Sequence, residues 1–211
     1  MSQFNQNYWD KMYAEEDGSI IDGIHNAKEH ALYTKSILDL GEMDVNSIAD
    51  FGFGKGILLR EFVKVFKPKQ ILAIDPSKEA FDNLSKQKWL KKVKHKILQT
   101  TIENFPQSRN SKPFDLGICN SIFQYISDKD VSSSFVKLSK LCKYIYFSVP
   151  TKVDYDYMKK ELNFIDPYAN SRTKEFYLKT LKPYFTLVSY NLLESKVHMK
   201  DSGFTYEFFR F

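Results

Sequence analysis

Apolar positions along the first 150 residues follow two spacings in turn, and their alternation predicts the fold. Apolar side chains at helical spacing form one-sided faces in several segments. The expected helices span 27–40, 57–66 and 131–141, and a further helix begins after a capping Ser77. Short continuous apolar runs lie between them and are typical of strands covered on both faces. The expected strands span 48–51, 71–74, 96–99, 114–119 and 144–149.

The pattern changes after residue 150. An aromatic segment containing Tyr155, Tyr157 and Tyr168 has no clear period and is expected to be irregular. A helix is expected near 172–181, followed by two strands at 185–193 and 204–211. These last strands have no helix between them, so they are expected to form an antiparallel pair at one edge of the sheet.

Strands that alternate with helices indicate an α/β fold. We expect a doubly wound, mostly parallel seven-stranded sheet, with an antiparallel strand at one edge and helices on both faces. Ligands of such sheets bind beyond the carboxyl ends of the strands, so residues that follow the strands are the first candidates for function.

A glycine cluster lies at one of these positions. The chain has eight glycines, and Gly52, Gly54 and Gly56 stand between an expected strand and an expected helix. Glycine allows a tight turn there and a close approach of the backbone to a ligand. Asp75 ends the next strand, 21 residues after Gly54, and an acid at that distance can accept hydrogen bonds from ribose hydroxyls. A nucleoside is therefore the indicated ligand.

The glycine spacing departs from two other nucleotide motifs. The dinucleotide pattern G-x-G-x-x-G requires glycine where this chain has Ile57. A phosphate-binding P-loop requires Ser or Thr after its lysine, whereas Gly56 follows Lys55.

Asp50 to Gly56 resembles the D-x-G-x-G-x-G signature of class I S-adenosylmethionine-dependent methyltransferases, which have a Rossmann-like fold. Further segments resemble that family in order: 71–76 its second strand, 101–106 the loop against the adenine, and 114–125 its fourth strand. The resemblance implies S-adenosyl-L-methionine as cofactor. It also implies a set of cofactor-binding residues: Tyr13, Asp50, Gly52, Gly54, Gly56, Asp75, Pro76, Thr101, Ile102 and Asn120.

Residues 8–10 with Tyr13 resemble the N-terminal lid of small-molecule members. The resemblance thus divides one domain, 1–211, into a helical lid (1–45), a cofactor-binding core (46–150) and a substrate-side insertion with the final strand pair (151–211). Substrate-binding candidates are Tyr8, Tyr155, Tyr157 and Tyr168, although these rings can equally pack on the sheet.

Catalytic groups are less defined than the cofactor site. Many family members have an aspartate where this chain has Thr101, and a Glu-His or similar pair often stands where this chain has Gln124-Tyr125. His25 and His30 are candidate bases because histidine titrates near neutral pH, and Tyr125 is a third candidate. No metal-ligand set is apparent.

Composition narrows the class further. With 43% hydrophobic residues the chain can bury a sizeable core. It has no apolar run of membrane-spanning length and no signal-peptide pattern, and its two cysteines lie in apolar stretches. These features favour a cytoplasmic protein in a reducing compartment.

The net charge of +5 does not decide the partner. Only four of the 31 basic residues are arginine, which nucleic-acid surfaces favour. Six lysines gather over 86–96 around Trp89; a solvated helix end is favoured over an RNA-binding patch.

The favoured function is methyl transfer to a small-molecule O or N acceptor, by in-line displacement. An RNA or protein methyltransferase that docks its substrate on the lysine-rich 86–96 face is the main alternative. A non-catalytic nucleoside-binding module and an NAD-dependent oxidoreductase are less favoured. The sequence leaves the acceptor atom, the pathway and the oligomeric state open.

Overall fold

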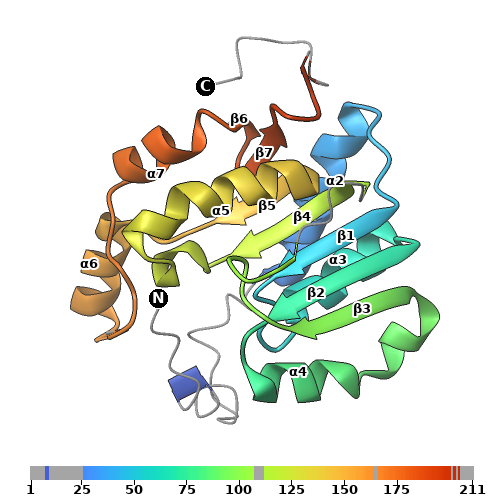
Figure 1. Cartoon of the computed structure of the whole chain (residues 1–211), viewed down its shortest axis with the longest axis horizontal. Helices are drawn as coiled ribbons and strands as arrows, with labels where there is room; N and C mark the ends of the chain where they lie inside the picture. The colour runs from blue at the N-terminus through green and yellow to red at the C-terminus, as the bar shows by residue number, and fades with distance from the viewer. Residues whose placement is uncertain are drawn as a thin grey trace.

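A seven-stranded sheet organises the residues that the computed structural model describes, which are 8–9, 26–106, 112–163, 166–200, 202 and 204. The strand order is β3-β2-β1-β4-β5-β7-β6 (Figure 1). The strands are β1 (Ser47–Phe51), β2 (Gln70–Asp75), β3 (Lys94–Gln99), β4 (Phe114–Asn120), β5 (Cys142–Ser148), β6 (Phe185–Ser189) and β7 (Leu192–Ser195). β1 to β5 pair in parallel, whereas β7 runs antiparallel to both β5 and β6. The predicted doubly wound, mostly parallel sheet is confirmed.

Helices cover both faces of this sheet (Figure 1). The α-helices are α2 (Ala27–Leu40), α3 (Ile57–Phe66), α4 (Lys78–Ser85), α5 (Asp128–Leu141), α6 (Lys152–Glu161) and α7 (Lys174–Leu181). The described part of the chain also contains two short 3-10 helices, η2 (Lys88–Lys92) and η3 (Phe123–Tyr125). None of the helices in this part of the chain is long and apolar enough to cross a bilayer.

One hydrophobic core lies on each face of the sheet, which explains why the sequences of the central strands are continuous apolar runs. Successive side chains of β5 point to opposite faces: Ile145 and Phe147 join a core with α5 and α7, while Tyr144 and Tyr146 join a core with α2, α3 and α4. Because every position of such a strand is covered, no polar alternation remains in the sequence.

The segment after β5 departs from the sequence-based expectation. The stretch expected to be irregular forms α6, in which no residue is buried. Its first turn explains the helix: Thr151 and Asp154 form a capping box, with the Asp154 carboxylate accepting from the Thr151 backbone N–H at 2.7 Å. The local cap therefore sets this helix, although it lacks an apolar face to bury.

The final strands are also differently placed. The strand expected over 185–193 is divided by a turn at Tyr190 and Asn191 into β6 and β7, and these two form the antiparallel pair. Asn191 has a φ of 55°, a left-handed conformation that asparagine tolerates better than most residues. The other expected strand, 204–211, lies outside the described residues apart from Phe204, which is not in a strand.

Candidate functional site

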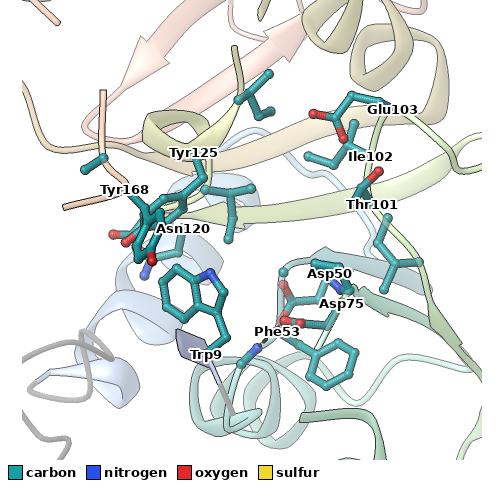
Figure 2. Close-up of a pocket in the computed structure, with 18 of the residues that line it drawn as sticks. Trp9, Asp50, Phe53, Asp75, Thr101, Ile102, Glu103, Asn120, Tyr125 and Tyr168 are labelled. Carbon is teal, nitrogen blue, oxygen red and sulfur yellow. Dashed lines mark hydrogen bonds between the residues drawn. The ribbon is translucent and has the colours of Figure 1, made fainter. Parts of the chain in front are cut away.

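A cavity of about 790 Å³ lies beyond the carboxyl ends of β1, β2 and β4. The loops that follow these strands provide most of its wall, and Trp9 and residues 167–170 add to it from distant parts of the chain (Figure 2). Its position is the one expected for a ligand of a doubly wound sheet, and its volume lies within the range of small-molecule sites.

The turn after β1 requires glycine. Gly52, Gly54 and Gly56 all have positive φ, at 84°, 52° and 71°, where other residues are strained. A side chain at Gly52 would also bring its Cβ to 2.2 Å from Cδ1 of Ile122. Gly52 and Gly54 line the cavity, whereas Gly56 is the N-cap of α3. Two of the three predicted glycines therefore face the cavity and the third positions the helix.

Asp75 is the best-defined acid of the site. It ends β2, is buried, and lines the cavity. One carboxylate oxygen accepts from the Gly54 backbone N–H at 2.9 Å, and the other accepts from the Ser77 N–H at 2.8 Å. Burial raises the pKa of Asp75 to about 6, and these two hydrogen bonds oppose the rise. A carboxylate has about four lone-pair directions, so Asp75 keeps capacity to accept from hydroxyl groups in the cavity.

A second acid lies close to the first. Asp50, in β1, is buried and also lines the cavity. Its pKa is raised by burial and, to a smaller extent, by the negative charge of Asp75. A positively charged ligand group between these carboxyls would lower the pKa of both.

The loop after β3 forms another wall. Thr101 and Ile102 line the cavity, and the Thr101 hydroxyl accepts from the Asn104 backbone N–H at 3.3 Å. Lys137, from α5, fixes this loop: its ammonium group donates to the backbone oxygens of Ile102 and Glu103 at 3.0 and 2.6 Å. Lys137 was not predicted, because nothing in the local sequence connects it to a loop over thirty residues away.

The end of β4 carries a further group of lining residues. Asn120 and Tyr125 line the cavity there, and Pro76 lines it after β2. Between Asn120 and Tyr125, Ser121 has a φ of 55°. Such strain in a non-glycine residue costs on the order of 1–3 kcal/mol and is found preferentially at functional sites.

Aromatic rings close the other end of the cavity. Trp9, Tyr125 and Tyr168 line it and lie together in Figure 2. The centroids of Trp9 and Tyr125 are 4.8 Å apart in an edge-to-face arrangement. Tyr8 packs on Tyr168 with a centroid distance of 4.7 Å. Trp9 was missed as a single residue, although the N-terminal segment that contains it was expected to cover the site.

The remaining candidates lie elsewhere. The His30 imidazole is in α2, where it pairs with the Tyr146 hydroxyl at 3.0 Å. Tyr155 and Tyr157 are in α6 and are not among the described lining residues; the Tyr157 side chain is largely exposed. Tyr13 and His25 lie outside the described residues.

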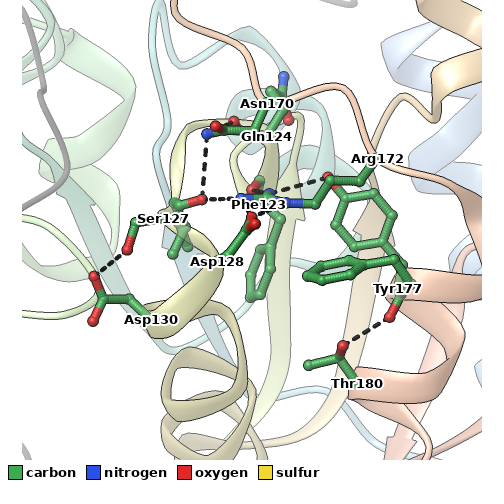
Figure 3. A network of polar contacts seen from close by, with 11 residues as sticks. Phe123, Gln124, Ser127, Asp128, Asp130, Asn170, Arg172, Tyr177 and Thr180 are labelled. Atoms are coloured by element: carbon green, nitrogen blue, oxygen red, sulfur yellow. Dashed lines mark hydrogen bonds and ion pairs between the residues drawn. The ribbon is translucent and has the colours of Figure 1, made fainter.

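A buried arginine holds the loop between β4 and α5 (Figure 3). The Arg172 guanidinium donates to the backbone oxygens of Phe123 and Ile126 at 2.8 and 2.5 Å and to the Asp128 carboxylate at 2.8 Å. Asn170 donates to the backbone oxygen of Gln124 through its backbone N–H at 2.8 Å and through its side-chain amide at 2.9 Å. Asn170 and Arg172 thus connect the ring end of the cavity to the loop after β4. The sequence had indicated only a helix near Arg172.

Comparisons with known proteins agree with this geometry. The profile of the family described as "Methyltransferase domain" matches residues 48–144, which span β1 to the start of β5. Residues 48–144 therefore match a methyltransferase domain, as expected for a class I S-adenosylmethionine-dependent methyltransferase. The predicted enzyme class and cofactor are thereby confirmed. Comparison with curated proteins gives no match.

Solved structures of methyltransferases share the fold. An S-adenosylmethionine-dependent methyltransferase from Clostridium acetobutylicum ATCC 824 superimposes with a TM-score of 0.66, at 15% identity, over 90% of this chain and 98% of that one. The N-methyltransferase NodS from Bradyrhizobium japonicum WM9, in complex with S-adenosyl-L-homocysteine, gives a TM-score of 0.63 at 11% identity, over 90% and 97%. The plantazolicin methyltransferase BpumL, in complex with a desmethyl plantazolicin analogue and S-adenosyl-L-homocysteine, gives 0.61 at 19% identity, over 84% and 68%.

Proposed function

We propose that this methyltransferase transfers the methyl group to an oxygen or nitrogen atom of a small molecule. The observation that carries the proposal is the form of the cavity, in which the glycine turn and Asp75 lie at one end and a group of packed aromatic rings at the other. A volume of about 790 Å³ has room for a small acceptor beside the cofactor.

The described residues suit the cofactor in three regions. Asp75 has lone pairs for the ribose hydroxyls, and the wall at Thr101 and Ile102 suits the adenine. Asp50 and Asn120 would hold the charged methionyl end, close to the side-chain-free backbone at Gly52. When bound, S-adenosylmethionine supplies a methyl group on a positively charged sulfur. The protein's own task is then to align the acceptor with that carbon and to exclude water.

The position of the lysines supports a small acceptor over RNA. Lys86 follows α4, η2 contains Lys88, Lys91 and Lys92, and Lys94 begins β3. These residues therefore gather at the amino end of β3, whereas the cavity lies beyond the carboxyl ends of the strands. A substrate docked on this stretch would have to cross the length of the sheet. Lysines on an edge strand are themselves a common protection against strand-to-strand aggregation.

The acceptor class can be tested with S-adenosylmethionine labelled in its methyl group. The purified protein is incubated with separated small-molecule, RNA and protein fractions of one cell extract, and transferred label is measured in each. We expect label in the small-molecule fraction. Label that appears only in RNA or protein would refute the proposed acceptor class.

Matched variants link this labelling to the cavity. Asp75→Asn should strongly reduce labelling, because it removes the negative charge and one of the two oxygens that can accept from the ribose hydroxyls. Asp82→Asn changes an exposed carboxylate that pairs with Lys78 at 2.5 Å on α4, and it should label as the wild type does. Equal loss in both variants would indicate a general effect on folding and not a role of the site.

A further inference from the structure

The ring end of the cavity is built around a carboxylate. Asp166 accepts a hydrogen bond from the Tyr125 hydroxyl at 2.6 Å and another from the Tyr168 backbone N–H at 3.0 Å. Its carboxylate forms no ion pair with a basic side chain in the part of the chain that the structure describes. A negative charge therefore lies beside the hydroxyl edge of Tyr125, a ring that lines the cavity.

This charge keeps the surrounding tyrosines protonated. Burial and then the Asp166 charge raise the pKa of Tyr8 to about 12. The same two causes, in the same order, raise the pKa values of Tyr125 and Tyr155 well above that of a free phenol. A raised pKa keeps the Tyr125 phenol protonated near neutral pH, which disfavours its role as a general base. Its neutral ring, polarised by the hydrogen bond to Asp166, instead presents an electron-rich surface.

From this geometry we infer that the rings of Trp9, Tyr125 and Tyr168, together with Asp166 at the Tyr125 hydroxyl, form an acceptor subsite for an alkyl amine bound as its ammonium ion. The inference rests on the proposed small-molecule function and narrows it to nitrogen. Aromatic faces attract ammonium groups, most strongly where water is excluded. An acceptor that must lose a hydroxyl proton is disfavoured, because the described tyrosines here keep their own protons and a developing oxyanion would be repelled by Asp166.

The reaction is balanced for an amine. The bound ammonium ion first releases one proton to water, and the nitrogen lone pair then forms the bond to the methyl carbon while the bond from that carbon to the donor sulfur breaks. Positive charge passes from sulfur to nitrogen during this step. The rings and Asp166 stabilise positive charge at the nitrogen, so they favour the transition state and the methylated ammonium product.

The test uses two probes of equal shape and different charge. Choline carries a quaternary ammonium group, and 3,3-dimethylbutan-1-ol has carbon in place of that nitrogen. Binding is followed by Trp9 fluorescence with S-adenosylhomocysteine saturating, in a Trp89→Phe background, since the chain has two tryptophans. We expect choline to bind about tenfold more tightly than the alcohol. Equal affinities, or no binding of choline, would overturn the inference.

Variants assign the preference to the subsite. Asp166→Asn and Tyr168→Leu should each reduce the preference for choline to about threefold or less. Tyr157→Leu removes an exposed ring of α6 and should leave it unchanged. Thermal melting identifies a variant that fails to fold, and the second variant then decides the outcome. A protein that does not bind S-adenosylhomocysteine at all contradicts the proposed function, whereas one that binds it without preferring choline contradicts this inference alone.

Discussion

Arg172 should contribute more to stability than any exposed ion pair of this protein. Its side chain is 5% exposed, while that of its partner Asp128 is 76% exposed. The guanidinium also donates to the backbone oxygens of Phe123 and Ile126, which lie in the buried part of the loop after β4. The informative substitution is Arg172→Met, since methionine keeps an unbranched apolar stem and removes only the charged donors.

The magnitude follows from what the substitution leaves behind. Two carbonyl oxygens lose their shortest donors and keep only long contacts, Phe123 from the Ile126 N–H at 3.3 Å and Ile126 from the Asn170 amide at 3.5 Å. A buried acceptor that loses its main partner costs about 1–3 kcal/mol. The ion pair itself adds little, because Asp128 is mostly in water and exposed pairs are worth about 0–1 kcal/mol. We therefore expect Arg172→Met to lower the free energy of unfolding by about 2–6 kcal/mol. For a chain of this size each kcal/mol corresponds to about 2–4 °C in Tm, so a loss of about 4 kcal/mol lowers Tm by about 8–16 °C.

Urea unfolding followed by circular dichroism measures this effect, and an unchanged m-value shows that the two folded states are comparable. Asp128→Asn is the matched control, because it removes the charge of the partner and leaves both carbonyls satisfied; it should cost less than about 1 kcal/mol. Arg172→Lys should lie between the two, since one ammonium group cannot reach all three acceptors at once. If Asp128→Asn destabilises the protein as much as Arg172→Met, the carbonyl argument is wrong and the ion pair dominates.

Three further predictions concern the cofactor end. S-adenosylhomocysteine should bind about tenfold more weakly near pH 5 than near pH 7, because about a tenth of Asp75 is ionised one unit below its pKa of about 6. Calorimetry should show weak, pH-independent binding in the control variant Asp75→Asn. If the affinity of Asp75→Asn still changes with pH, Asp75 is not the cause of the change. Gly52→Ala should weaken this binding and destabilise the protein by about 1–2 kcal/mol, because alanine is strained at a φ of 84°. Adding Ile122→Ala should restore part of the affinity, since it removes the side chain that the new Cβ would meet. Full affinity in the single variant would contradict this prediction. Lys137→Met should speed amide hydrogen exchange in residues 101–106, because the backbone oxygens of this loop lose their donor. Unchanged exchange would show that Lys137 does not stabilise the loop.

The cofactor end was predictable because its signals are local. A tight turn needs glycine within a few residues of the strand that it follows, and Asp75 needs only to end the next strand. Both requirements are visible in a short stretch of sequence, and the parallel sheet brings the two stretches together by its own topology. The same locality made the boundaries of α2 and α3 predictable to the residue.

The ring end was not predictable in the same way. Arg172 contacts residues 44 to 49 positions earlier, and Lys137 contacts a loop 32 to 35 positions earlier. Contacts between residues so far apart leave no periodic pattern in the sequence. A charged residue that makes them therefore looks like part of a solvated helix. The prediction missed α6 for a different reason. Thr151 and Asp154 stand at capping-box spacing, so a local helix signal was present, but the aromatic residues around it favoured an irregular segment.

The two ends of the cavity also differ in how they carry charge. Asp75 has a folded-state pKa raised from 3.8 to about 6, so the folded protein without cofactor binds more protons than the unfolded chain in this range. Its contribution to stability is therefore largest below about pH 4 and is lost as pH rises through about 6, by about 2–3 kcal/mol in total. This part of the fold is most strained at the pH where the ionised carboxylate is needed for the cofactor. A bound ribose would satisfy the ionised carboxylate and relieve that strain. At the ring end, the Tyr125 hydroxyl and the Tyr168 backbone N–H both donate to Asp166, so this carboxylate already has two protein partners before any ligand binds.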